Sequence, residues 1–116
     1  AEFWLNGTND WIYRHLHKAA SLMIRLARSN PRARGLKKRA LNQAARELLL
    51  AQSSDWAFIM STGTTVPYAH KRTKDHLHYF MKIYESVNNN SIEEKFISEL
   101  EQRDNVFPNL NYRVYA

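Results

Sequence analysis

Apolar residues recur along most of the chain with the period of an α-helix. Between residues 10 and 29 they fall at i, i+3, i+4 and i+7 spacing, and Arg and Lys occupy the opposite face. The same period returns over residues 36–52, 67–88 and 91–103. No segment alternates convincingly between apolar and polar positions, as a half-buried strand would. We therefore predict an all-α fold, a helical bundle of three long helices with shorter pieces.

Residues that stop or start helices mark the ends of these segments. Asn30 precedes Pro31, and the residue before a proline is pushed out of the α region, so the first helix should end there. Pro67 suits the first position of the third helix. Ser91 and Glu94 have the spacing of a capping box, which predicts a shorter fourth helix after a break at residues 88–90.

The stretch 48–64, LLLAQSSDWAFIMSTGT, departs from the amphipathic pattern. Its first four residues are apolar on every side, which predicts a helix end enclosed by other elements. Ser53, Ser54 and Asp55 then offer side-chain oxygens to the N–H groups of a new helical turn starting at Trp56. We predict a capped corner at SSDW, followed by a short additional helix.

The tail after Asp104 is aromatic and irregular. It carries Val106, Phe107, Leu110 and Tyr112. A tail free in water would not carry so many apolar side chains, so we expect it to lie back along the bundle.

Composition favours one helical domain spanning residues 1–116. The chain has 116 residues, no cysteine and only three Gly and three Pro. The absence of cysteine excludes disulfides and favours a reducing compartment. The apolar runs are too short to span a bilayer and no signal peptide is evident, so we expect a cytoplasmic protein without a membrane partner.

The charge distribution leaves two interpretations open. The net charge is +6, and between Trp11 and Arg46 there are ten Lys or Arg and no acid. The basic segment, residues 25–39, could bind the phosphates of a nucleic acid. Alternatively it is a solvated turn balanced by the acidic residues at 93–104 or by another domain, since no recognition-helix motif accompanies it.

No arrangement of residues predicts an active site, a metal site or an organic cofactor. Four of the five histidines form pairs two residues apart, His15 with His17 and His76 with His78, and the members of each pair point away from each other on a helix. HExxH spacing is absent. We interpret His76 as a hydrogen-bonded histidine at a packing boundary. Each acid outside the fourth helix that could act in catalysis can be explained by a structural role instead. No glycine-rich phosphate loop is present.

Two tryptophans stand near the start of the chain, where a bundle core is hard to reach. Trp4 and Trp11 could present flat faces that stack on a sugar ring or on a partner. Packing of Trp11 against the C-terminal tail is the alternative.

Three motifs occur in order along the chain: WLNGTNDW at 4–11, LLLAQSSDWAFI at 48–59, and Tyr68-Ala69 with Arg72, His76 and Phe80. Together they resemble a known family, the C-terminal helical domain of family 57 glycoside hydrolases of the 1,4-α-glucan branching enzyme type. The resemblance covers nearly the whole chain and extends to the tail at 107–115.

The resemblance implies an upstream catalytic barrel whose Glu nucleophile and Asp acid/base transfer glucan with retention. Neither carboxylate maps onto this sequence, so the fragment alone is expected to be non-catalytic. The implied partners are that barrel and an α-1,4-glucan, with self-association of the isolated domain as a further expectation. Trp4 maps to a position that lines the glucan groove, and Trp11 is a second candidate. The expected interface or structural residues are Ser53, Ser54, Asp55, Trp56, Arg72 and His76. The alternatives are a nucleic-acid-binding helical module and a purely structural or oligomerising bundle.

Overall fold

The computed structural model describes the backbone of residues 7–60 and 66–116, and the side chains of residues 13–54 and 71–116. The described residues form four α-helices and one 3₁₀ helix, and no strand is found among them. In chain order the elements are α1 (Gly7–Ser29), α2 (Gly35–Met60), α3 (Val66–Asn88), α4 (Glu94–Arg103) and η2 (Tyr112–Tyr115). The all-α prediction is confirmed.

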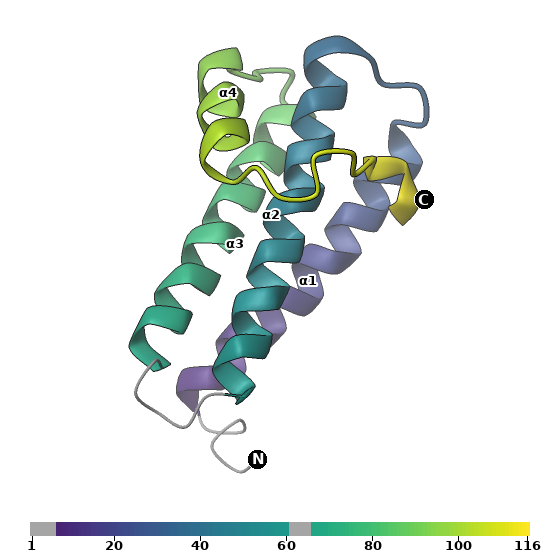
Figure 1. Ribbon diagram of the computed structural model, residues 1–116. Coiled ribbons are helices and arrows are strands. Elements are labelled where there is room, and N and C mark those ends of the chain that lie inside the picture. Colours follow the sequence, from purple (N-terminus) through teal and green to yellow (C-terminus); the bar gives the residue numbers. More distant parts are fainter. Residues whose placement is uncertain (1–6, 61–65) are drawn as a thin grey trace.

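The three long helices lie side by side, and α2 contacts each of the other elements (Figure 1). Helix α4 packs on α2 at the end of the bundle that holds the α1–α2 turn (Figure 1). The predicted apolar stripes meet in one core because each helix buries the face that carries them. Its largest fully buried apolar side chains are Met23, Leu41, Leu48, Phe80, Ile83, Ile97, Leu100 and Tyr112. The helical-bundle prediction is confirmed as well.

The predicted corner at Ser53–Trp56 is wrong, because α2 runs through it without a break to Met60. Leu48, Ala51 and Ser54 are buried at consecutive intervals of three residues, so the helical spacing continues into the serines. Strong helix formers precede the Ser-Ser-Asp run and apolar residues follow it, which keeps it helical despite its capping side chains. No separate short helix therefore follows the SSDW motif.

The predicted capping box at Ser91 and Glu94 is also wrong. The N-cap of α4 is Glu93, and no side chain caps the helix there. The backbone N–H of Ser91 instead donates to the carbonyl of Ser86, 2.9 Å away, so Ser91 closes the end of α3. Asn90 adopts a left-handed φ of 52°, a conformation that asparagine tolerates at a helix end. The predicted break after Asn88 is confirmed.

The α1–α2 turn is held by side chains from both of its sides. Helix α1 ends at Ser29, as predicted, and the Asn30 side chain donates to the carbonyl of Leu26 at 2.9 Å. Gly35 begins α2 with a φ of 62°, which only glycine adopts without strain. From the tail, the Arg113 guanidinium donates to the carbonyls of Pro31 and Ala33 at 2.9 and 3.1 Å.

The tail crosses α2 and reaches α1 (Figure 1). Tyr112 is fully buried, and its hydroxyl donates to the carbonyl of Asn30 and accepts from the N–H of Ala33. Its own N–H donates to Asn42 Oδ1 at 2.9 Å. The expected packing of Phe107 is wrong, since its side chain is 56% exposed while its carbonyl turns inward to accept from Arg46.

Among the described residues, none of the helices is both apolar enough and long enough to cross a membrane.

Tyr112→Phe should destabilise the protein by about 1–3 kcal/mol, because it leaves the buried polar groups of Asn30 and Ala33 without their partner. Urea unfolding followed by circular dichroism measures the change. Val114→Ala, at a side chain that is 70% exposed in the same 3₁₀ helix, is the control and should change stability little. Equal effects of the two substitutions would contradict this role of the hydroxyl.

Candidate functional site

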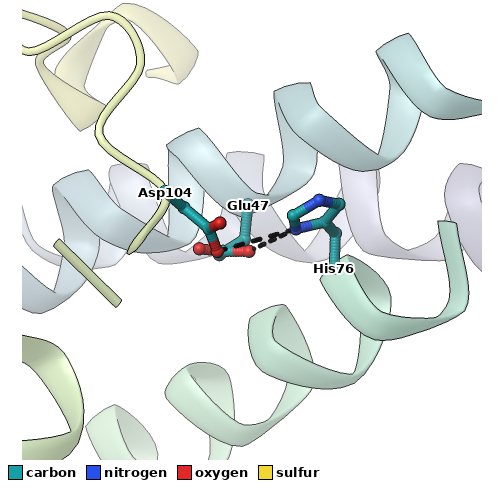
Figure 2. A group of neighbouring side chains, drawn as sticks. All are labelled: Glu47, His76 and Asp104. Atoms are coloured by element: carbon teal, nitrogen blue, oxygen red, sulfur yellow. Dashed lines mark hydrogen bonds and ion pairs between the residues drawn. The ribbon is translucent and has the colours of Figure 1, made fainter. Parts of the chain in front are cut away.

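Three titratable side chains from separate parts of the chain meet in the interior. They are Glu47 on α2, His76 on α3 and Asp104 directly after α4 (Figure 2). His76 Nδ1 lies 2.7 Å from Glu47 Oε1 and 3.8 Å from Asp104 Oδ2. Glu47 is fully buried, and the other two are less than a tenth exposed. We call this group the Glu47–His76–Asp104 cluster.

The helical register brings the cluster together. Ala40, Ala44 and Ala51 fall on the same face of α2 as Glu47, and all of them are fully buried. Small side chains let the neighbouring helix approach closely, and α2 makes its most extensive contact with α3. His76 is one turn before Phe80 on the inner side of α3, so its ring reaches Glu47.

A polar network on α2 fixes the Glu47 carboxyl. Gln43 Nε2 donates to Glu47 Oε2 at 2.9 Å and to the Leu100 carbonyl at 3.3 Å. Arg46 Nη1 in turn donates to Gln43 Oε1 at 2.8 Å. Glu47 Oε2 is thereby engaged, and Oε1 faces His76.

The environment disfavours ionisation of Glu47. Burial is the largest cause and raises the pKa of Glu47 to about 7. The hydrogen bond with His76 opposes this rise, and the nearby Asp104 carboxylate adds to it. Within the described part of the chain, Asp104 Oδ2 is the one buried side-chain oxygen or nitrogen that has no hydrogen-bond partner.

The cluster borders a surface cavity of about 240 Å³. Its lining is polar and mixes both signs of charge: Arg72, Asp75, His76, Tyr79, Arg103 and Asp104. The Arg103 guanidinium lies 4.5 Å from the centre of the Tyr79 ring and 3.9 Å from Asp104 Oδ1. The cavity gives solvent a route to His76 and Asp104.

The residues selected from the sequence do not form one site. His76 is buried and hydrogen-bonded, in line with its interpretation, and Arg72 is exposed at the cavity beside it. Ser54 is buried and Ser53 exposed on α2, away from the cavity lining. Trp4 lies outside the described residues. Trp11, Asp55 and Trp56 lie within helices, but their side chains are outside the described set.

Sequence spacing did not predict Glu47 and Asp104 as site residues, because they lie 57 positions apart on different elements and share no motif within one helix. The available signal was an acid at position 47 on the inner side of an alanine-rich helix, where a carboxylate needs a partner. Which helix would supply that partner depends on tertiary packing.

Acidic side chains of α4 neutralise part of the positive charge of the basic segment, residues 25–39. Arg39 makes a bidentate contact with Glu101, at 2.7 and 3.2 Å, and also bonds Glu94 and Ser98. These hydrogen bonds, first to Glu101 and then to Glu94, raise the pKa of the Arg39 guanidinium. The contacts support the interpretation that the acidic fourth helix balances this charge. Arg25, Arg28, Arg32 and Arg34 remain exposed.

Glu47→Gln should flatten the pH dependence of stability between about pH 4.5 and 7. The folded pKa of about 7 lies above the ordinary value of 4.5, so the folded state binds the proton more tightly and loses stability as pH rises through this window. The loss in the unsubstituted protein should reach up to about 3 kcal/mol. Urea unfolding in chelator-containing buffer at several pH values measures it. Glu99→Gln, at an exposed acid of α4, is the control; parallel curves for the Glu47 variant and the parent would contradict the assignment.

Comparison with known proteins identifies relatives for almost the whole chain. The family described as 1,4-alpha-glucan branching enzyme, C-terminal, matches residues 15–115. The 1,4-alpha-glucan branching enzyme of Thermococcus kodakarensis is 34% identical over 109 residues, which cover 90% of this chain and 16% of that protein.

Two solved structures share the fold. The crystal structure of the alpha-amylase AmyC from Thermotoga maritima superposes with a TM-score of 0.85 at 47% identity, over 96% of this chain and 22% of that one. The GH57-type branching enzyme from Pyrococcus horikoshii superposes with a TM-score of 0.80 at 33% identity, over 97% of this chain and 22% of that one. The chain thus spans less than a quarter of the length of these relatives. Together with the four-helix fold, these matches show that the chain belongs to the family of C-terminal domains of 1,4-alpha-glucan branching enzymes.

Proposed function

We propose that this chain is the accessory C-terminal domain of an α-glucan-active enzyme of the branching-enzyme type, and that it braces the catalytic barrel and completes the glucan groove. The family match over residues 15–115, set beside the small share of each relative that the chain spans, carries the proposal. The domain is non-catalytic by itself, and the enzyme that contains it acts in the cytoplasm.

We infer that the reaction of the whole enzyme is determined by its catalytic barrel and not by this domain. One relative is named an alpha-amylase and two are named branching enzymes, so the same helical domain accompanies both activities. We infer that the parent transfers α-1,4-glucan segments to form branches, using a Glu and an Asp of its barrel. The domain's contribution is to hold the glucan and the barrel in place.

We infer that one side of α1 faces the barrel. Tyr13, His17, Ala20 and Ile24 follow one another at intervals of three or four residues, so they share one helical face. Tyr13 is 58% exposed and Ile24 36% exposed, and a cavity of about 210 Å³ opens beside Tyr13, between α1 and Gln52 of α2. Exposed aromatic and aliphatic side chains next to a shallow cavity favour protein contact.

Trp4 precedes this face by nine residues, and we assign it to the glucan groove. The indole would stack on a glucose ring through its flat apolar surface. Trp11 is the second candidate, on the first turns of α1.

A nucleic-acid role has less support. Arg39, in the basic segment, is held by Glu94 and Glu101 rather than left available for phosphates. Duplex binding at low salt that fails when Arg34, Lys37 and Lys38 are reversed in charge would favour it instead.

In the full-length parent enzyme, Trp4→Ala should raise the KM for a linear α-1,4-glucan about three- to tenfold, because one stacking contact is lost. Steady-state kinetics with glucans of increasing length measure the change. Trp4→Phe should restore most of the affinity. Unchanged KM and activity in the alanine variant would remove Trp4 from the groove.

Tyr13→Ala should weaken the packing of this domain against the barrel. We expect the full-length parent to inactivate faster on heating, whereas the melting temperature of the 116-residue chain falls less, because the Tyr13 side chain is largely exposed in it. Val114→Ala, at a side chain that is more exposed and lies near the other end of the bundle, should leave both unchanged. Equal destabilisation of the chain and the parent would show that Tyr13 acts within the domain alone.

A further inference from the structure

We propose that the Glu47–His76–Asp104 cluster binds one divalent transition-metal ion, of which zinc fits the donor set best. The cluster offers one imidazole nitrogen and two carboxylate oxygens, and these three atoms lie within 4.8 Å of one another. Nitrogen and oxygen donors of these types are common zinc ligands. This inference does not depend on the function proposed above.

The distances require only small adjustments. In a tetrahedral zinc site with bonds of about 2.0–2.2 Å, ligand atoms stand roughly 3.4 Å apart. His76 Nδ1 is now 2.7 Å from Glu47 Oε1 and 3.8 Å from Asp104 Oδ2, so the values lie on either side of that separation. Figure 2 shows the two carboxylates and the ring pointing toward one another from three separate parts of the chain.

The unpartnered oxygen of Asp104 points to a ligand. Asp104 is 9% exposed, and its Oδ2 is buried next to His76 without a hydrogen-bond donor. A buried carboxylate oxygen without a partner is costly, and either a proton shared with Glu47 or a cation at the cluster would remove that cost. The ion would also displace the proton that burial favours on Glu47 and would offset the charges of both carboxylates.

The surroundings orient the ligands as the outer groups of metal sites do. Gln43 Nε2 donates to Glu47 Oε2 and so leaves Oε1 directed at the cluster. Arg46 fixes Gln43 in turn. The charge of Arg103 lies near Oδ1 of Asp104, whereas Oδ2 is the oxygen that faces His76.

The cavity beside the cluster supplies access and an open coordination position. His76 and Asp104 line it, so an ion can arrive from solvent and keep a water molecule as its fourth ligand. Asp75, on the same cavity wall, pairs with Lys71 at 3.1 Å and is not required. Because the ligands come from α2, α3 and the end of α4, the ion would tie these parts together.

Zinc binding by the chain tests the proposal. The protein is stripped with EDTA, exchanged into metal-free buffer and titrated with zinc chloride by isothermal calorimetry, with the melting temperature measured in parallel. We expect one ion per chain and a rise in melting temperature with added zinc. A folded chain that shows no binding heat and no thermal shift would overturn the proposal and leave the two carboxylates sharing a proton.

Substitutions locate the ion. Asp104→Asn should weaken zinc binding by at least about tenfold, as should Glu47→Gln. Asp75→Asn, in the same cavity, and His78→Gln, at an exposed histidine two residues from His76, are the matched controls and should bind like the parent. Parental affinity in the Asp104 variant would overturn the proposal, since the ion would then lie elsewhere.

Cobalt absorption covers the case in which a variant fails to fold. Co²⁺ bound to the unsubstituted chain should show the intense visible bands of a four-coordinate site with a nitrogen ligand. The weak spectrum of a six-coordinate, mostly hydrated ion would overturn the assignment.

Discussion

Enclosure of α2 is the constraint on which the rest of the molecule depends. This helix contacts every other element, and most of its side chains between residues 35 and 54 are buried or half-buried. Three of them, Gln43, Arg46 and Glu47, are nevertheless polar and buried. Polar groups that cannot reach water must bond within the protein. Their partners therefore determine where the neighbouring elements can lie.

Each of these three residues reaches a different part of the chain. Glu47 bonds His76 on α3, and Gln43 bonds the carbonyl of Leu100 on α4. Arg46 donates to the carbonyls of Phe107 and Pro108 in the tail. Apolar packing alone would tolerate sliding or rotation of α3 and α4 on α2, whereas these bonds are satisfied in one register. The polar network thus adds specificity to a core whose stability comes from apolar burial.

Local signals in the sequence predicted the helices and most of their ends. The helical period, Pro31 and the asparagines after Val87 act within a few residues, so their effect can be foreseen without a tertiary structure. The serines at 53 and 54 led to the wrong prediction of a helix end, because serine can lie inside a helix as well as cap one. Burial of the inner face continues through Ser54, and α2 runs on without a break. The cluster could not be foreseen in this way, since it needs the registers of α2, α3 and α4 at once.

Tyr112 has a consequence for the order in which the protein can be completed. Its hydroxyl serves the α1–α2 turn, although Asn30 and Ala33 precede it by 82 and 79 residues. At the usual rate of translation those two residues wait on the order of ten seconds before their partner is made. During that interval the α1–α2 turn has been made, but the Tyr112 hydroxyl that bonds it has not. The first two helices can form early on the ribosome, whereas the hydrogen bonds from Tyr112 to their connection form only after η2 has been made.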